Sequence, residues 1–421
     1  MQYTWLPASS PDPKDIIKVV KTEGSHLILD NGNAIYDAIS SWWCKPMGHR
    51  HPLMQEALIE QLARYEHHIP ANTYNDNIEE LSYKLTNKLQ NPYKVMYASD
   101  GSSAIEIAMK LSYETRLLTN EPNRNKFLAL NNSYHGETIF TLSVCGLDNY
   151  KKNYKPFLTD NYFINNIPYV NFTSDSLWLD CRDAFKDIET YLDNIKTNIT
   201  ALIIEPVVQG AAGLKIISKD FLVKLLKWAK NNNIHIISDE IMVGLGRLGF
   251  FCVTKELLGF EADFICFAKN LTAGIIPMSA VLIKNSIFDN FKIKNKLFAH
   301  SHTHSCNSLA ASVANKYLSY LEENNLNKVV FDNEIKIRQM LGLLSNKYSF
   351  IDNIRAIGSI AAFDINSINN MEQVFSLAIK HGIYLRPIGN TLYIMPPIYN
   401  LRNDLIEIES KLINILDDFS I

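Results

Sequence analysis

Two apolar stretches show most clearly how this chain folds: IHIISDE at residues 234–240 and ADFICFAKN at residues 262–270. Each is a run of mostly apolar residues that is too short for an average helix but long enough for a strand. We therefore predict strands at Ile234–Ser238 and Asp263–Ala268. Because the apolar residues do not alternate with polar ones, both strands are expected to be buried on both faces, as in a parallel sheet.

Similar short runs on either side of these two stretches alternate with segments of helical pattern. We expect further strands at Lys94–Ala98, Lys126–Leu130, Ala201–Ile204 and Ala280–Ile283, and helices at Leu53–His67, Ile78–Leu89 and Ser103–Leu118. Strands that alternate with helices predict βαβ units, and therefore an α/β fold with a mainly parallel sheet.

The two ends of the chain have a different pattern. Residues 1–50 are predicted to be irregular except for a hairpin over His26–Tyr36 that turns at DNGN, residues 30–33. After about residue 305 the pattern predicts helices near 308–323, 331–346 and 402–418, with strands near 354–365 and 391–395. A chain of 421 residues is long enough for two domains. We predict a large cofactor-binding domain over 51–305 and a small α+β domain over 306–421, to which the segment 1–50 contributes.

The amino-acid composition argues against a nucleic-acid-binding, membrane or secreted protein. The chain is 47% hydrophobic and 20% charged with a net charge of −3, which does not favour a nucleic-acid or membrane-surface partner. Its six cysteines form no C-x-x-C pair and are predicted to be reduced thiols. The segment Met1–Asp15 has no apolar core typical of a secretory signal, and no apolar run is long enough to cross a bilayer. We therefore expect a cytoplasmic protein.

The residues that follow the predicted strands can carry chemistry, because ligands of open α/β sheets bind at the carboxyl ends of the strands. Asp239 and Glu240 end one strand, where a carboxylate can hold a protonated ring nitrogen, bind a metal or cap the next helix. Lys269 ends the other, although lysine is seldom buried without a partner or a covalent role. A desolvated lysine with a lowered pKa is the usual amine for forming a Schiff base.

A third strand end carries YASDGSSAIE at residues 97–106, where a glycine and serines open a helix. Exposed N–H groups and the helix dipole make such a start a phosphate site, although an ordinary serine-capped helix is also compatible with it. A phosphate site, a carboxylate and a buried lysine together are what pyridoxal phosphate requires. The sequence therefore predicts this cofactor, with Asp239 at its ring nitrogen and Lys269 at its aldehyde.

One glycine motif points to another cofactor. GLGRLG at residues 244–249 matches the dinucleotide-binding pattern, which should open a helix. The following segment Phe250–Thr254 is β-like instead, and no acidic residue stands about 20 positions further on. Nicotinamide or flavin binding is therefore not favoured.

Alternating histidines suggest a metal site. His300, His302, His304 and Cys306 would lie on one face of an extended segment, as ligands of a His/Cys site do. No second cluster supplies supporting carboxylates, and alternate histidines in a loop often face solvent or a partner chain. We expect no metal.

These motifs resemble a known family. The stretch SDEIMVGLGR at residues 238–247, with Lys269 following, is similar to the signature of class III aminotransferases. SWW at residues 41–43 with GHRHP at 48–52, SYHGET at 133–138, and LRP and YIMPP at 385–387 and 393–397 resemble the branch of this family that acts in biotin synthesis. The likeness extends from about Trp5 nearly to the C-terminus.

The resemblance implies the fold and the catalytic residues. It implies a fold-type I pyridoxal-phosphate-dependent transferase, whose large domain has a mainly parallel seven-stranded sheet flanked by helices. Lys269, Asp239 and Tyr134 would be catalytic, with Tyr134 stacked on the cofactor ring. Gly101 and Ser102 would bind the cofactor phosphate.

It also implies a homodimer with shared active sites. Thr303 would reach the cofactor phosphate of the neighbouring subunit, and His302 would also bind the cofactor. Arg386 would pair with a substrate carboxylate, for which its planar guanidinium is suited. The remaining substrate contacts implied are Trp42, Trp43, Tyr134, Ser301 and Lys269.

The reaction implied is transfer of the amino group of S-adenosylmethionine to 8-amino-7-oxononanoate, which gives 7,8-diaminononanoate. The chain departs from the family pattern at Ala8, where a tyrosine is usual, at the loop His300–His304 and at Asp100. An alternative is another ω-aminotransferase that uses lysine, ornithine or 4-aminobutyrate. A protein that binds the cofactor without catalysis is disfavoured, because Lys269 and Asp239 are both present.

Overall fold

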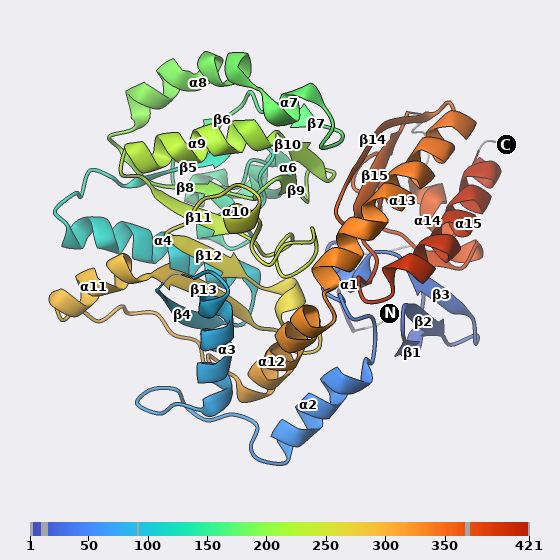
Figure 1. Cartoon of the computed structure of the whole chain (residues 1–421), viewed down its shortest axis with the longest axis horizontal. Coiled ribbons are helices and arrows are strands. Elements are labelled where there is room, and N and C mark those ends of the chain that lie inside the picture. Colours follow the sequence, from blue (N-terminus) through green and yellow to red (C-terminus); the bar gives the residue numbers. More distant parts are fainter. Residues whose placement is uncertain (1–2, 10–15, 91, 367–370, 420–421) are drawn as a thin grey trace.

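The computed structural model describes residues 3–9, 16–90, 92–366 and 371–419 (Figure 1). Part of the segment Met1–Asp15, for which no signal was expected, lies outside these residues. The centre of the molecule is a seven-stranded sheet, as expected. Its strands, in spatial order, are β4 (Tyr93–Ala98), β13 (Ser279–Lys284), β12 (Phe264–Phe267), β11 (His235–Asp239), β8 (Ile199–Ile204), β5 (Lys126–Leu130) and β6 (Tyr162–Ile164). Only β13 runs antiparallel to its neighbours.

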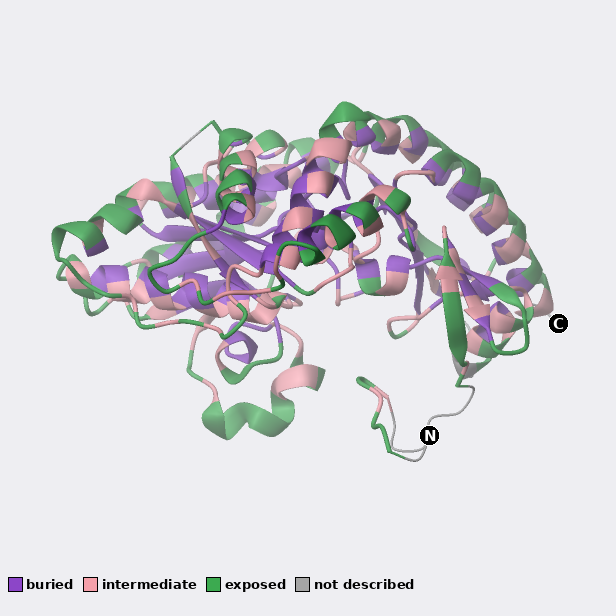
Figure 2. Ribbon diagram, turned by 90° about the horizontal axis from the view of Figure 1, so that it is seen from below, coloured by how far each residue is buried: buried purple, intermediate pink, exposed green. Residues whose placement is uncertain are grey.

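Helices cover both faces of this sheet, which explains why its strands are apolar throughout. On β11, Ile237 packs in the same core as α4 (Gly101–Leu118), and Ile236 packs in the core that includes α9 (Lys219–Asn231). Figure 2 shows buried residues concentrated in the strands and on the inner faces of the helices. Burial of both faces removes the polar alternation that a half-exposed strand would need.

Other helices surround the sheet or extend toward the C-terminal part. They are α2 (Pro52–Leu62), α3 (Asp76–Asn87), α8 (Arg182–Ile195), α11 (Asn285–Ile293), α12 (Ser308–Glu323), α13 (Leu326–Lys347), α14 (Met371–Lys380) and α15 (Leu401–Phe419). Helix α2 ends five residues before the predicted His67. The Gln61 side chain donates to Tyr65 O (2.9 Å), and the backbone turns there instead of continuing as a helix.

Three smaller sheets complete the fold. The predicted hairpin is present as β2 (His26–Leu29) and β3 (Ala34–Asp37) and joins β1 (Val19–Glu23) and β16 (Ile383–Tyr384) in a four-stranded sheet. A second sheet is β14 (Ile351–Ile357), β15 (Ile360–Ile365) and β17 (Thr391–Ile394), and a third is β7 (Tyr169–Val170), β10 (Lys215–Ile217) and β9 (Val208–Gln209). The domain limits at residues 50 and 305 remain a prediction.

Two local predictions are wrong. Residues 354–365 are not one strand, because the chain turns at Gly358 between β14 and β15. Gly358 has φ +58°, and a Cβ there would lie 3.1 Å from Arg247 O. Phe250–Thr254 is not β-like either: it leads into the short helix α10 (Val253–Glu256). The Glu256 side chain accepts the N–H of Cys252 (2.9 Å), which stabilises this helix start.

Candidate active site

A cavity of about 370 Å³ lies at the carboxyl ends of the central parallel strands. Its walls include the residues that directly follow β4, β8 and β12, residues 134–136 after β5, and the last residue of β11. Of the predicted site residues, the cavity brings together Trp43, Gly101, Ser102, Tyr134, Asp239 and Lys269. Gly101, Ser102, Asp239 and Lys269 lie in the strand-end segments singled out from the sequence, whereas Trp43 and Tyr134 were expected only from the family resemblance.

Lys269 begins a short 3₁₀ turn, Lys269–Thr272, immediately after β12. Its Nζ lies 5.2 Å from the centre of the Trp43 ring, over its face. Burial lowers the pKa of Lys269, although the charges of Asp239 and Glu205 oppose this shift. A lowered pKa increases the fraction of neutral amine, which is the form that reacts with a carbonyl.

Asp239 faces the same cavity and is paired with a histidine. His135 Nδ1 donates to Asp239 Oδ2 at 2.7 Å, and both side chains are nearly inaccessible to solvent. The other ring nitrogen of His135, Nε2, is buried and has no hydrogen-bond partner among the described residues. The other oxygen, Oδ1, accepts the backbone N–H of Ile241 at 3.2 Å, so the Asp239 carboxylate is held in one orientation from both sides.

Glu240 has a different role from its neighbour Asp239. Its Oε1 accepts the N–H of Thr254 (2.8 Å) and its Oε2 accepts the N–H of Val253 (3.0 Å). These are free N–H groups at the start of α10, so Glu240 satisfies a helix N-terminus. The helix-capping role that the sequence left open for this carboxylate pair thus belongs to Glu240.

Glu205 is a buried carboxyl group next to this pair. It accepts the backbone N–H groups of Tyr134 (2.9 Å) and Gly210 (3.0 Å). Burial raises the pKa of Glu205 to about 7; the charge of His135 lowers it and that of Asp239 raises it. Glu205 therefore changes protonation near neutral pH within reach of the cavity.

The start of α4 supplies free backbone donors. Asp100 is the N-cap and accepts the N–H of Ser103 at 2.9 Å. Among the described residues, no hydrogen-bond acceptor faces the N–H groups of Gly101 and Ser102. These two groups and the dipole of an 18-residue helix can bind an anion.

Tyr134 lies beside this helix start. Its hydroxyl donates to Glu137 Oε1 at 2.8 Å, and its ring contacts the Tyr150 ring at 5.2 Å between centres. Gly136, two residues on, has φ +130° and packs closely on the Ser102 side chain. The segment after β5 and the start of α4 are thus held together by a glycine that has no room for a Cβ.

The two predicted tryptophans come from an unusual turn. Ser40, Ser41, Trp42 and Trp43 all have positive φ, from 45° to 73°, which makes one left-handed helical turn. This conformation costs roughly 1–2 kcal/mol per residue for residues other than glycine. Nothing in the sequence of this segment predicts it, because glycine and asparagine, which favour this conformation, are absent.

Trp42 and Arg386 do not line the Lys269 cavity. They line a neighbouring cavity of about 680 Å³ together with Ala8 and other residues of the N-terminal segment. The Arg386 guanidinium lies 4.4 Å from the centre of the Trp42 ring, and Nη2 donates to Ala8 O at 3.0 Å. Arg386 is thus partnered by an aromatic face and a carbonyl, and no carboxylate of the described residues is within ion-pair distance of it.

The predicted residues Ser301, His302 and Thr303 also lie outside the Lys269 cavity of this single chain. Thr303 is exposed, and its carbonyl accepts His67 Nε2–H at 2.9 Å. The segment turns at residues 303–306 rather than being extended, so His304 packs on His67 while His300 packs on Phe298. Among the described residues, no group of three or more His, Cys, Asp or Glu side chains is suited to bind a metal.

The site residues predicted from the sequence include neither His135 nor Glu205. Both line the cavity, and both follow predicted strands closely: Glu205 comes directly after β8, and His135 comes five residues after β5. The signal that could have found them is therefore the strand-end position already used for Asp239. In the part of the chain that the structure describes, no helix is both long and apolar enough to span a membrane.

Comparisons with known proteins agree with this geometry. Residues 8–416 match the family "Aminotransferase class-III". A Helicobacter pylori protein named adenosylmethionine-8-amino-7-oxononanoate aminotransferase is 33% identical over 99% of this chain and 97% of its own. A protein of the same name from Synechococcus elongatus is 30% identical over 99% of both chains.

Solved structures show the same fold. The Methanocaldococcus jannaschii adenosylmethionine-8-amino-7-oxononanoate aminotransferase superposes with a TM-score of 0.89 at 25% identity, over 99% of this chain and 97% of that one. A Bacillus anthracis aminotransferase superposes with a TM-score of 0.92 at 22% identity, over 99% of this chain and 96% of that one. Since the family match extends over nearly the whole length and the strand ends meet in one cavity, the chain belongs to the class III aminotransferases.

Proposed function

We propose that this aminotransferase binds pyridoxal 5'-phosphate in the Lys269 cavity and transfers the amino group of S-adenosylmethionine to 8-amino-7-oxononanoate. The product would be 7,8-diaminononanoate, an intermediate of biotin biosynthesis. The observation that carries the proposal is that the Lys269 amine, the Asp239 carboxylate and the free N–H groups of Gly101 and Ser102 line one cavity. The names of the curated relatives support the choice of substrates.

The residues of the cavity fit this cofactor. Asp239 is oriented by His135 at Oδ2 (2.7 Å) and by the N–H of Ile241 at Oδ1 (3.2 Å), and its carboxylate lines the cavity, where it would accept a hydrogen bond from a protonated ring nitrogen. The α4 start has donors for a phosphate, and Tyr134 supplies an aromatic face beside it. When bound, pyridoxal phosphate supplies an electron-accepting ring that stabilises negative charge at the carbon bearing the amino group.

Lys269 would attach the cofactor and, once an amino substrate has displaced it, act as a base. Burial lowers the pKa of its amine, so Nζ can be neutral and take a proton from the amino-bearing carbon. Trp43, whose ring lies 5.2 Å from Nζ, would exclude water from one side of this amine. Nζ, protonated by this step, would also be the group that gives the proton back.

The neighbouring cavity would hold the rest of the substrate. Trp42 and Trp43 are adjacent residues that line different cavities, so the two cavities would be successive parts of one site. Arg386 would bind the carboxylate that both substrates carry. This carboxylate would replace the Ala8 carbonyl as the hydrogen-bond acceptor of Arg386. The apolar side chains around Trp42 suit a long aliphatic chain.

A second subunit would complete the site. Thr303 is exposed in the single chain, and we infer that with Ser301 and His302 it reaches the other subunit's cavity. Exposed apolar side chains support such an interface, among them Ile59 (66% exposed) and Leu297 (79%).

The test is a visible absorption spectrum of the purified protein before and after adding S-adenosylmethionine. We expect a band from the bound cofactor that shifts on addition, and 7,8-diaminononanoate detected by mass spectrometry when 8-amino-7-oxononanoate follows. A band that responds only to lysine, ornithine or 4-aminobutyrate would contradict the donor and retain the aminotransferase. Protein that shows no band even with added cofactor would contradict the cofactor itself.

A further inference from the structure

The left-handed turn Ser40–Trp43 is a run of four consecutive residues with positive φ that borders both cavities. Its four consecutive φ angles are 50°, 45°, 69° and 73°. The turn is closed by backbone hydrogen bonds from Trp43 N to Ile39 O (2.8 Å) and from Cys44 N to Ser40 O (2.9 Å). Such conformations persist only where surrounding contacts impose them, and they cluster at functional sites.

One buried carboxylate, that of Asp37, stabilises this turn through hydrogen bonds from the side away from the cavities. Asp37, the last residue of β3, is 1% exposed and lines neither cavity. Its Oδ2 accepts the hydroxyl of Ser41 at 2.7 Å and Nε2–H of His49 at 2.9 Å. Ser40 adds a second anchor by donating to Met395 O at 2.7 Å.

The turn sets the orientation of both Trp42 and Trp43. Trp42 carries the Arg386 guanidinium on its face at 4.4 Å in the outer cavity. Trp43 faces Lys269 in the inner cavity and donates Nε1–H to the Tyr393 hydroxyl at 3.0 Å. A relaxed backbone at Ser41 would redirect both rings at once, because they are the next two residues.

We propose that Asp37 is a positioning residue: by holding Ser41 and His49 it keeps the left-handed turn, and thereby places Trp42 and Arg386 to receive a carboxylate-bearing aliphatic substrate. This inference rests on the proposed function for the identity of the substrate. Asp37 does not touch the substrate, and its effect on binding passes through the turn. The strain in the turn is therefore part of how the site is organised before a substrate arrives.

The test compares Asp37→Asn with a matched control, Asp404→Asn, in the full-length holoenzyme. Asp404 is also a buried carboxylate (5% exposed) that accepts a serine hydroxyl, Ser25 Oγ at 2.9 Å, but it contacts neither the turn nor either cavity. The probe is nonanoate, a nine-carbon carboxylate without a reactive amine, and its Kd is measured by isothermal titration calorimetry. Near-ultraviolet circular dichroism reports the environment of the tryptophans, two of which lie in the turn.

We expect Asp37→Asn to raise the Kd for nonanoate about tenfold, as for loss of one well-placed polar contact. KM for 8-amino-7-oxononanoate should rise in parallel while kcat changes much less, and the tryptophan dichroism should change. Asp404→Asn should lower thermal stability and leave the Kd and the dichroism unchanged. Equal Kd values for Asp37→Asn and wild type would overturn the proposal and leave Asp37 a structural residue.

A second variant applies if Asp37→Asn does not fold. Ser41→Ala removes the hydroxyl that Asp37 holds, and we expect it to raise the Kd for nonanoate about threefold; because Ser41 also lines the outer cavity, the tryptophan dichroism must change with the Kd for the effect to be assigned to the turn. An unchanged Kd in that variant would also overturn the proposal. If wild type itself does not bind nonanoate, the proposed substrate class fails, and the tryptophan dichroism alone then decides whether Asp37 holds the turn.

Discussion

At the scale of single residues, chain neighbours in this site have opposite environments. Asp239 faces the cavity and pairs with His135, whereas Glu240 turns away and binds the first N–H groups of α10. In a strand, successive side chains point to opposite faces, so one peptide step separates a reactive position from a structural one. Trp43, in the inner cavity, and Trp42, in the outer one, are also separated by one peptide step, in this case within the left-handed turn.

This contrast predicts opposite effects of two similar substitutions. We expect Asp239→Asn to lower kcat at least about a hundredfold, the usual scale for a group that controls a proton, with little loss of stability. Glu240→Gln should lower the free energy of unfolding by about 1–3 kcal/mol, because its amide N–H₂ opposes the donors of Val253 and Thr254. Steady-state kinetics and urea unfolding measure the two effects. Similar losses of activity in both variants would contradict the separation of roles.

Lys269 allows a sharper residue-scale prediction. Lys269→Ala should lower kcat by about a thousandfold or more, because it removes both the proposed attachment point of the cofactor and the proposed base. Added methylamine should restore part of the activity, since a free amine can take the proton that Nζ no longer takes. Lys294→Ala, at an exposed position on the surface, is the control and should match wild type. Activity retained in Lys269→Ala without added amine would exclude Lys269 as the base.

At the scale of elements, the buried strands and long helices could be predicted because burial of both faces leaves a plain apolar pattern. Helix α12 has the predicted limits, Ser308–Glu323. The strands of two or three residues, such as β9 and β16, could not be predicted, since so few residues carry no periodicity. Likewise the left-handed turn at Ser40–Trp43 depends on Asp37 and Met395, and the second of these is distant in sequence.

The close contact between the segment after β5 and the start of α4 also depends on distant residues, and it gives an element-scale prediction. Gly136→Ala would place a Cβ 2.7 Å from Ser102 Cβ and 2.9 Å from Thr141 Oγ1, at a φ of +130°. The start of α4 must then move, so we expect the affinity for inorganic phosphate and for pyridoxal phosphate to fall together, at least about tenfold.

The matched control is Gly342→Ala in α13, where a Cβ meets nothing within 4 Å. Alanine is the better helix former, so this variant should be more stable by about 0.5–1 kcal/mol and bind cofactor as wild type does. Equilibrium dialysis measures the affinities. Gly136→Ala with unchanged cofactor affinity would show that α4 does not hold the phosphate.

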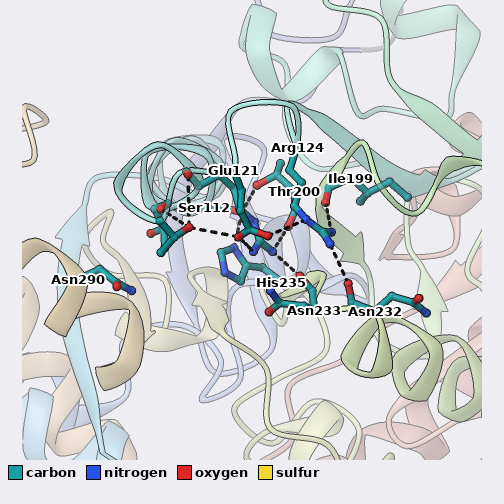
Figure 3. Close-up of polar contacts among 12 residues, drawn as sticks. Ser112, Glu121, Arg124, Ile199, Thr200, Asn232, Asn233, His235 and Asn290 are labelled. Carbon is teal, nitrogen blue, oxygen red and sulfur yellow. Dashed lines mark hydrogen bonds and ion pairs between the residues drawn. The ribbon is translucent and has the colours of Figure 1, made fainter.

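At the scale of the whole molecule, the opposite end of the sheet has its own buried polar network (Figure 3). Ser112 of α4 lies 2.9 Å from both Thr200 Oγ1 of β8 and His235 Nδ1 of β11. Arg116 donates to the carbonyls of Thr200 (3.0 Å) and Asn233 (2.7 Å). Strand β11 therefore joins the two ends: His235 begins it in this network, and Asp239 ends it in the cavity.

This network predicts how stability depends on pH. Burial lowers the pKa of His235 well below its ordinary value of 6.5, and the charges of Arg116 and Arg124 act in the same direction. Below pH 6.5 the unfolded chain binds a proton at this position that the folded protein does not bind. Stability is therefore complete above that pH and lost as pH falls, by about 1 kcal/mol between pH 6.5 and 5.5 from this residue.

His235→Asn removes the pH-dependent contribution of this residue to stability. The asparagine amide oxygen can still accept a hydrogen bond from the Ser112 hydroxyl. At pH 8, where the histidine is neutral in both states, the variant should be less stable than wild type by a constant amount that reflects packing. Between pH 6.5 and 5.5 its free energy of unfolding should fall less steeply than that of wild type, and urea unfolding at each pH measures the two curves. Parallel curves would mean that His235 has the same pKa in the folded and the unfolded protein. The network at this end of β11 would then accommodate a protonated His235 beside its arginines.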